Sequence, residues 1–369
     1  MHPTRSYSDP SDSISLPGAA VGFDLGHRFG PARTHGPGGD SPGRVPTTPS
    51  GRPRHAGGSD TGRPRLALGR GVRRSWRRRA RHGEIRRVEM SVELSTASLR
   101  VARQGEGQPL LLLSGLGASL DMWARLAGHL TGFELISFDP PGLGGSGPVR
   151  FPVNMTNLAG IAADLLEVLG HDRVDVLGYS WGGALAQELA HRFPDRVRRL
   201  VLCASTCGVG GVPGSVAALA VLANPWCHRS RLYLERVAPR LYGGAVGRNP
   251  AWFLDASVPP GHPPNPLGYA AQLYAIATWT SLPWLHRLPM PTLIVTGNDD
   301  PVVPLANARV LANRIPNCHL HIVEGCGHLL LLDQPGEVAP LVREFLLNPA
   351  SRAVPRLPWA RRQLVVPGR

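Results

Sequence analysis

The chain has 369 residues and a formal net charge of +14, with 40 basic residues against 26 acidic ones. The charge is concentrated at the N-terminus, because residues 1–89 hold 17 arginines and 7 acidic residues, which accounts for +10. The charge of the larger part, residues 90–369, is only +4 and does not indicate a nucleic-acid-binding protein.

The sequence also argues against a membrane protein and against a secreted protein. The N-terminus lacks the apolar core of a signal peptide, and no apolar run approaches the roughly 20 residues that span a bilayer. The cysteines are odd in number and lack metal-ligand spacing, which is typical of buried thiols in a reducing compartment. They are Cys203, Cys207, Cys227, Cys318 and Cys326. We therefore expect a cytoplasmic protein without a membrane span.

Residues 1–89 are rich in Gly, Pro, Ser and Arg. Such a segment cannot bury enough apolar surface to offset its ordering entropy, so a disordered extension is expected. The arginine-rich run at 73–81 could bind nucleic acid or another acidic surface, although a solvated basic tail is the ordinary interpretation of this composition. A third interpretation is that the native chain starts at Met90, where the strand pattern begins. An intact mass starting before Met90 would reject it.

From Met90 onward, strand and helix patterns alternate, which predicts an α/β fold with a mostly parallel central sheet and helices on both faces. The core is expected in residues 90–205 and 289–347, followed by a frayed tail at 348–369. The predicted strands are 91–94, 99–102, 110–113, 135–138, 174–177, 200–203, 292–295 and 320–323, of which the first two form a hairpin. The predicted helices are 158–169, 184–190 and 338–347.

The alternation is interrupted in residues 206–288. This segment contains Trp226, Trp252, Trp279 and Trp284 and a proline-rich stretch at 258–264. A long insertion in a compact α/β unit is usually functional or disordered, and the aromatic content argues against disorder. The segment is therefore predicted to be a helical lid, in which each single tryptophan is expected to pack the lid onto the body.

The pentapeptide Gly178-Tyr179-Ser180-Trp181-Gly182 lies between the predicted strand 174–177 and the predicted helix 184–190. A serine between two glycines at a strand-to-helix corner is typical of a nucleophile elbow. The glycines are needed because the turn is tight and a Cβ at either flank would crowd the neighbouring strand or helix. We predict that Ser180 is a nucleophile, and a purely structural turn residue is the alternative.

A serine hydroxyl is a poor nucleophile at neutral pH and needs a neighbouring base. His328, in the turn 325–328, directly follows the predicted strand 320–323. Open α/β sheets place their sites at this end of a strand. Of the 14 histidines, His328 alone combines this position with nearby glycines and the chain order Ser, Asp, His. We expect it to accept the Ser180 proton and pass it to the leaving alcohol.

A carboxylate should orient this histidine and stabilise the imidazolium. The segment 296–304 follows the predicted strand 292–295 and contains two adjacent candidates, Asp299 and Asp300. We predict Asp300, with Asp299 as the alternative. Whichever residue does not take this role is expected to be a turn residue or a hydrogen-bond partner in the loop.

Acyl transfer also needs backbone N–H groups that point at the developing oxyanion. One is expected from Trp181, the residue after the nucleophile, and the second from Leu116, in the loop 114–118. An ordinary glycine turn is the alternative for this loop. Another glycine-rich stretch, 139–146, lacks the lysine and spacing of phosphate-binding loops and is expected to be a structural turn near the site. Since no His/Cys/Asp cluster indicates a metal, neither metal nor cofactor is expected.

With these motifs, residues 91–347 resemble α/β-hydrolase-fold enzymes. The matching motifs are the elbow at 178–183, the loop at 138–142, the acid turn at 297–301 and the histidine turn at 325–328. Within this fold, the chain is similar to intracellular depolymerases of medium-chain-length poly(3-hydroxyalkanoate). The segments that carry this likeness are 141–146, 180–187, 278–281, 284–285, 299–301, 307–309 and 315–317.

The resemblance implies hydrolysis of 3-hydroxyacyl esters at the surface of storage granules through an acyl-enzyme. It assigns Ser180 as nucleophile, Asp300 as acid and His328 as base. One departure is Ser114, where many α/β hydrolases have a histidine before the oxyanion glycine, although a side-chain change there need not disturb a backbone donor. The basic N-terminal extension also lies outside the family pattern.

The leading hypothesis is therefore a serine esterase that acts on poly(3-hydroxyalkanoate) or its oligomers, because an apolar lid suits medium-length aliphatic side chains. A general carboxylesterase or lactonase with the same triad is the first alternative. A non-catalytic binding or granule-coat protein is the second, although such proteins normally lose a triad residue and none is lost here. Dehalogenase and epoxide-hydrolase chemistry is disfavoured, because those relatives have Asp at the position of Ser180. The oligomeric state stays open.

Overall fold

The computed structural model describes residues 87–149, 153–224, 226, 231–250 and 264–348. Several sequence predictions concern residues outside these ranges. They are the extension up to residue 86, the tail from 349 on, Cys227, Trp252 and nearly all of the proline-rich stretch.

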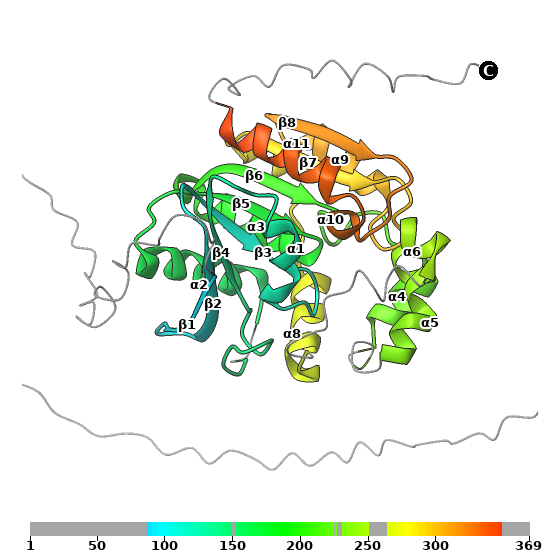
Figure 1. The fold of residues 1–369 in the computed structure, drawn as a ribbon, viewed down its shortest axis with the longest axis horizontal. Helices are drawn as coiled ribbons and strands as arrows, with labels where there is room; N and C mark the ends of the chain where they lie inside the picture. The colour runs from blue at the N-terminus through cyan, green and yellow to red at the C-terminus, as the bar shows by residue number, and fades with distance from the viewer. Residues whose placement is uncertain (1–86, 150–152, 225, 227–230, 251–263, 349–369) are drawn as a thin grey trace, which may run out of the picture. The chain divides into compact units, whose positions relative to one another are not determined.

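The core is an eight-stranded sheet with the order β1-β2-β4-β3-β5-β6-β7-β8 (Figure 1). β1 pairs antiparallel with β2 and β2 antiparallel with β4, whereas all pairs from β4 to β8 are parallel. The mostly parallel sheet predicted from the sequence is therefore confirmed. The strands are β1 (Val88–Glu93), β2 (Ser98–Gln104), β3 (Gln108–Leu113), β4 (Phe133–Phe138), β5 (Val174–Tyr179), β6 (Val197–Cys203), β7 (Thr292–Gly297) and β8 (Cys318–Val323).

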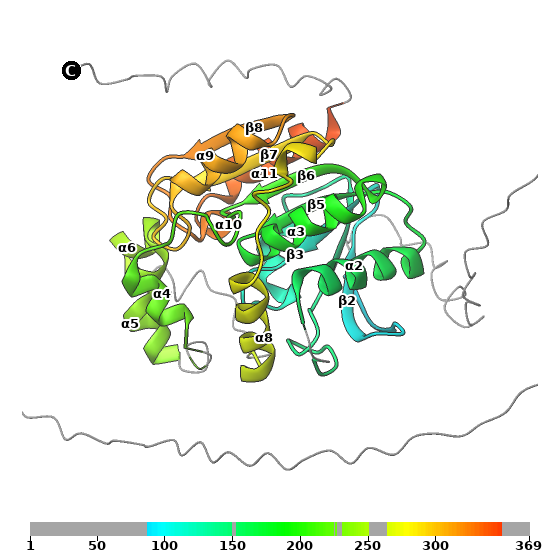
Figure 2. The same cartoon turned by 180° about the vertical axis from the view of Figure 1, so that it is seen from behind.

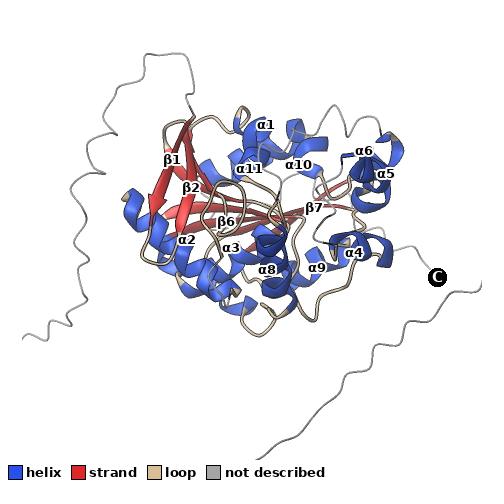
Figure 3. Cartoon of the chain, turned by 90° about the horizontal axis from the view of Figure 1, so that it is seen from below, coloured by secondary structure: helices blue, strands red, loops and turns tan. Residues whose placement is uncertain are grey.

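Helices cover both faces of this sheet (Figure 3). One face is covered by α1 (Ala124–Ala127), α10 (Leu330–Asp333) and α11 (Pro335–Leu347), and the other by α2 (Met155–Leu169), α3 (Trp181–Arg192) and α9 (Leu305–Arg314). Successive strand residues point to opposite faces. On β3, Leu111 and Leu113 therefore pack with α2, α3 and α9, and Leu110 and Leu112 with the other three helices. Burial on both faces explains the continuous apolar run of this strand.

The first strand begins before the boundary expected from the sequence. Val88 pairs with Arg103 and Glu89 with Ala102, so β1 includes two residues that the sequence analysis assigned to the N-terminal extension. Glu89 is held there by an ion pair with Arg100 of the adjacent strand. This contact joins residues that are distant in sequence, which is why the local pattern did not indicate it.

Within 206–288, the described residues form four α-helices: α4 (Val216–Leu222), α5 (Arg231–Tyr242), α6 (Gly244–Arg248) and α8 (Pro266–Ala277). Figures 1 and 2 show α4, α5 and α6 grouped together, with α8 standing beside them. Tyr269 in α8 is buried, and its hydroxyl donates a hydrogen bond to the backbone carbonyl of Leu222 in α4. This bond links the two parts of the segment.

Two tryptophans attach the end of this segment, which the sequence predicts to be a lid, to the body. The indole Nε1 of Trp279 donates to the carboxylate of Glu188 on α3 at 2.8 Å. The Trp284 ring stacks on His191 of the same helix with a centroid separation of 4.2 Å. Trp279 and Trp284 thus pack against α3, as expected, whereas Trp226 is exposed. In the part of the chain described here, no helix has both the length and the apolar character needed to cross a bilayer.

Candidate active site

Ser180 lies at the corner between β5 and α3 and has a φ of 53° and a ψ of −118°. Among the described residues, it shares a positive φ outside glycine only with Ala204. Backbone strain of this kind persists where the surroundings impose it and is frequent at functional sites. A Cβ on Gly178 would collide with the carbonyl of Gly182, and one on Gly182 with the carbonyl of Leu113. The flanking glycines are therefore required by close backbone contacts.

The structure brings three of the predicted side chains together. The Ser180 hydroxyl oxygen lies 3.0 Å from Nε2 of His328, and Nδ1 of His328 lies 2.7 Å from Oδ2 of Asp300. In the tautomer that this arrangement favours, Nδ1–H donates to the carboxylate and Nε2 accepts from the hydroxyl. His328 and Asp300 are 5 % and 6 % exposed. The arrangement can activate a serine for acyl transfer.

The two adjacent aspartates have different surroundings. Oδ1 of Asp300 accepts hydrogen bonds from the backbone N–H groups of Val302 and Val303, each at 2.9 Å, which leaves Oδ2 for the histidine. Oδ2 of Asp299 instead accepts from the N–H of Gly244 in the lid at 2.9 Å. Asp300, rather than Asp299, therefore faces the imidazole.

The backbone of the histidine turn is also fixed from two other elements. The N–H of His328 donates to the carbonyl of Tyr242, the last residue of α5, at 2.7 Å. Its carbonyl accepts a hydrogen bond from the buried hydroxyl of Tyr179 at 2.9 Å. Burial, together with the nearby Asp300 carboxylate, raises the pKa of Tyr179, so this hydroxyl remains a neutral donor. Neither contact was anticipated from the sequence, although Tyr179 lies inside the elbow motif.

We expect Tyr179→Phe to destabilise the fold by about 1 kcal/mol, because the buried carbonyl of His328 loses this donor. The turnover of an ester should fall by less than about tenfold, since the histidine keeps its other contacts. Urea unfolding and steady-state kinetics measure the two effects. Tyr274→Phe is the matched control, because Tyr274 is exposed on α8. Equal unfolding free energies for the two variants would contradict the stabilising role of the Tyr179 hydroxyl.

The predicted oxyanion loop lies against the nucleophile. A Cβ on Gly115 would be 3.6 Å from the Cβ of Ser180. The loop makes a tight turn in which Ala118 N–H donates to the Gly115 carbonyl at 3.1 Å and Gly117 has a φ of 70°. Within the described residues, the backbone N–H groups of Leu116 and Trp181 have no hydrogen-bond partner. Both N–H groups can thus donate to an oxyanion, and their role in the reaction stays a prediction.

Ser114, where many α/β hydrolases have a histidine, points its hydroxyl at Trp123 and Ser119 and not at Ser180 or His328. Its hydroxyl accepts a hydrogen bond from the indole Nε1 of Trp123 at 2.9 Å and lies 3.4 Å from the carbonyl of Ser119. The side chain is buried. Ser114 therefore supports the start of the loop through its neighbours and leaves the backbone donors in place.

The glycine-rich stretch at 139–146 is organised by a buried carboxylate. Asp139 accepts hydrogen bonds from the N–H groups of Leu120 and Gly145 at 2.7 and 2.9 Å and from Arg100 at 3.3 Å. A Cβ on Gly144 would collide with this carboxylate. The stretch is a structural turn, and the described residues contain no group of metal-ligating side chains.

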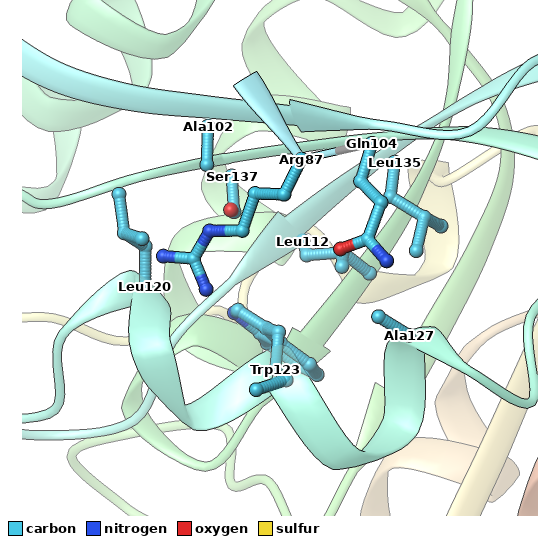
Figure 4. Close-up of a pocket in the computed structure, with 10 residues that line it drawn as sticks. Arg87, Ala102, Gln104, Leu112, Leu120, Trp123, Ala127, Leu135 and Ser137 are labelled. Atoms are coloured by element: carbon cyan, nitrogen blue, oxygen red, sulfur yellow. The ribbon is translucent and has the colours of Figure 1, made fainter. Parts of the chain in front are cut away.

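A small pocket lies under α1, between the helix and the strands β2, β3 and β4 (Figure 4). Its lining includes Arg87, Gln104, Leu112 and Trp123. None of the residues predicted for the reaction lines it. We therefore assign this pocket to the packing of the helix on the sheet and not to substrate binding.

Comparisons with known proteins agree with the fold described above. A sequence model described as "alpha/beta hydrolase fold" matches residues 108–335. The chain is 41% identical over 270 residues to a poly(3-hydroxyalkanoate) depolymerase of Ectopseudomonas oleovorans, a match that covers 72% of this chain and 94% of the relative. It is 30% identical over 257 residues to a 2-hydroxymuconate semialdehyde hydrolase of Pseudomonas putida, covering 66% and 88%.

Solved structures show the same fold. The enol-lactonase from Burkholderia xenovorans LB400 matches with a TM-score of 0.61 and 23% identity, over 70% of this chain and 100% of that one. A hydrolase from Pseudomonas aeruginosa PA01 matches with a TM-score of 0.60 and 24% identity, over 70% and 98%. At these identities the likeness describes the architecture alone.

Proposed function

The chain belongs to the α/β-hydrolase family, and from that membership we propose that it cleaves ester bonds of poly(3-hydroxyalkanoate) or its oligomers through an acyl-enzyme on Ser180. The observation that carries the proposal is the continuous hydrogen-bonded chain from Ser180 through His328 to Asp300. The choice of polyester is supported by the 41% identity to a poly(3-hydroxyalkanoate) depolymerase.

In the first half of the proposed reaction, the Ser180 oxygen attacks the ester carbonyl while Nε2 of His328 takes its proton. The Asp300 carboxylate stabilises the resulting imidazolium. The N–H groups of Leu116 and Trp181 donate to the oxyanion of the tetrahedral intermediate. His328 then returns the proton to the departing alkoxide, which leaves as the 3-hydroxyl group of one fragment.

In the second half, water replaces the departed alcohol. Nε2 of His328 takes one proton of the water as its oxygen attacks the acyl carbonyl, and the same proton is returned to Ser180 Oγ when the acyl bond breaks. The products are a 3-hydroxy acid and the free serine. Every proton is thus transferred through one imidazole, so the cycle needs no other base.

Hydrolysis of the polymer tests the proposal directly. Purified enzyme should release 3-hydroxyoctanoate from medium-chain-length polymer, and Ser180→Ala should release none. Cleavage of p-nitrophenyl esters without release from polymer or oligomers would instead support the general carboxylesterase or lactonase alternative. Fluorophosphonate labelling without hydrolysis of any ester would support the non-catalytic alternative.

Exposed apolar side chains on the lid support docking at a polyester surface. Val216 on α4 and Leu232 on α5 are 85 % and 79 % exposed, and Leu267 on α8 is also exposed. Apolar side chains grouped on one segment are typical of interaction surfaces. An aliphatic polyester could cover them by the hydrophobic effect, and we include granule association in the proposed function.

We expect the double variant Val216→Ser, Leu232→Ser to bind suspended polymer severalfold more weakly than the wild type while hydrolysing soluble p-nitrophenyl esters at the same rate. Both side chains are exposed, so their replacement should leave stability within about 0.5 kcal/mol. Leu347→Ser, at an exposed leucine on α11, is the matched control outside the lid. Sedimentation with the polymer measures binding. Unchanged binding of the double variant would remove the lid from the docking proposal.

We also propose a cytoplasmic location on such granules. The four cysteines in the described part of the chain are free thiols, namely Cys203, Cys207, Cys318 and Cys326. Burial raises the pKa of the Cys203 and Cys318 thiols to about 12. Free protonated thiols are consistent with a reducing compartment. Fractionation of cells that contain granules tests the location.

A further inference from the structure

α8 carries one buried carboxamide on an otherwise apolar face. Gln272 is 2 % exposed, and the other buried residues of the helix are Gly268, Tyr269, Ala271 and Ala275. A polar side chain in such surroundings normally has its hydrogen-bonding groups satisfied. We therefore expect each polar atom of the Gln272 side chain to have a partner.

Gln272 contacts both segments that carry the proposed oxyanion donors. Its Oε1 accepts a hydrogen bond from the backbone N–H of Gly117, the residue after Leu116, at 2.7 Å. The backbone carbonyl of Gln272 accepts a hydrogen bond from the indole Nε1 of Trp181 at 3.0 Å. A single lid residue thus joins the oxyanion turn to the start of α3.

The orientation of the carboxamide follows from the first of these bonds. A backbone N–H can only donate, so the oxygen of the Gln272 side chain must face Gly117. The amide nitrogen Nε2 is bonded to the same carbon as this oxygen and therefore also lies beside the turn. Nε2 is buried and has no hydrogen-bond partner among the described residues.

A buried amide donor without a partner destabilises the fold, so its retention needs a reason. Three other buried nitrogen atoms lack a hydrogen-bond partner in the described residues, on Arg87, His171 and Arg343, although Nε2 of His171 lies 3.4 Å from the carboxylate of Glu134. None of those residues hydrogen-bonds to the segments that carry Leu116 and Trp181, as Gln272 does. The position of Nε2 indicates a donor that is kept for an oxygen atom of the substrate.

We propose that Gln272 recognises the oxygen substituent at C3 of a 3-hydroxyacyl group: Nε2 donates to this oxygen function while Oε1 holds the oxyanion turn. The inference rests on the proposed ester hydrolysis and defines its acyl specificity. C3 is two bonds from the carbonyl carbon, so a group beside the oxyanion donors can reach its substituent. An unsubstituted acyl chain has only C–H groups there and would leave Nε2 unpaired. Sites built to bond a substrate oxygen reject analogues that lack it.

The comparison of two soluble esters tests this recognition without requiring any variant. The wild type should cleave p-nitrophenyl 3-hydroxyoctanoate with a kcat/KM about tenfold higher than p-nitrophenyl octanoate, the effect of one hydrogen bond. Both esters share the leaving group and the chain length, so the ratio isolates the C3 oxygen. Equal values of kcat/KM in the wild type would overturn the inference.

Two variants distinguish the role of Oε1 from the role of Nε2 in the Gln272 side chain. Gln272→Met keeps the length but removes both, so kcat should fall for both esters and the ratio should approach one. Gln272→Glu, assayed at alkaline pH to favour the carboxylate, keeps an acceptor for Gly117 N–H and loses the donor. It should lose the preference while it retains more activity on the octanoate ester than the Met variant. Circular dichroism and thermal unfolding report whether each variant folds.

Tyr274→Phe, on the exposed side of the same helix, is the control and should keep the wild-type ratio. A wild-type ratio in folded Gln272→Met would assign the preference to another residue and overturn the role of Nε2. If the wild type prefers the 3-hydroxy ester but does not cleave the polyester, the polymer function fails and the recognition of the C3 oxygen stands. If the wild type cleaves the polymer but shows no preference between the two esters, the polymer function stands and the recognition of the C3 oxygen fails.

Discussion

Replacing Ser180 with alanine is expected to lower kcat for ester hydrolysis by at least about 10⁴-fold, because the variant has no oxygen that can form the acyl-enzyme. The remaining activity would come from the oxyanion donors and from substrate binding. Stability should change little, since the strained φ of residue 180 stays the same and only the hydroxyl is lost. Steady-state kinetics and labelling with a fluorophosphonate measure the effect.

Ser91→Ala is the matched control for this experiment, because Ser91 is exposed on β1. It should keep full activity and full labelling. Labelling of Ser180→Ala that equals the wild type would show that another residue reacts with the probe. The assignment of Ser180 as nucleophile would then have to be abandoned, and with it the proposed mechanism.

Asp300→Asn is expected to reduce kcat by about 10⁴-fold, and Asp299→Asn by less than about tenfold. An asparagine at 300 can present its N–H₂ group to Nδ1 of His328, which favours the wrong imidazole tautomer. The same change at 299 affects a hydrogen bond to the Gly244 N–H of the lid, which is outside the proposed proton pathway. The two variants have the same chemistry at neighbouring positions, so each is the control for the other.

Kinetics on one soluble ester, with thermal unfolding to confirm folding, measure this difference. Similar losses in both variants would mean that the loop, rather than one carboxylate, is what the reaction needs. A larger loss for Asp299→Asn would reverse the assignment. In that case the hydrogen-bonded pair of Asp300 and His328 would have to be rearranged in the working enzyme.

The order of strands and helices was predictable because each buried strand has a distinctive local composition. The apolar run Leu110 to Leu113 and the run Val174 to Leu177 are covered on both faces, so nearly every residue in them is apolar. The residues at which helices and strands begin and end were harder to predict. α2 begins at Met155, three residues before the predicted start, because Asn154 caps it by accepting from the Asn157 N–H.

The candidate site was predictable to the extent that its signals are local. The elbow around Ser180 and the histidine turn are short motifs next to strands. The sequence favoured Asp300 but did not exclude Asp299, because the choice depends on hydrogen bonds that the loop forms only when folded. Gln272 was missed because it contacts Gly117, a residue 155 positions away. The one available signal was a lone amide in the apolar helix 266–277.

The hydrogen bond from His328 to Tyr242 has a consequence for the evolution and engineering of this enzyme. The end of α5 and the histidine turn share this bond, and Gly244 approaches Gly327 so closely that a Cβ on either would collide with backbone. Grafting a foreign cap between residues 206 and 288 would therefore replace part of the support of His328, the proposed general base. A chimera designed to change the substrate range should retain the Tyr242-Gly243-Gly244 tripeptide and exchange the helices on either side of it.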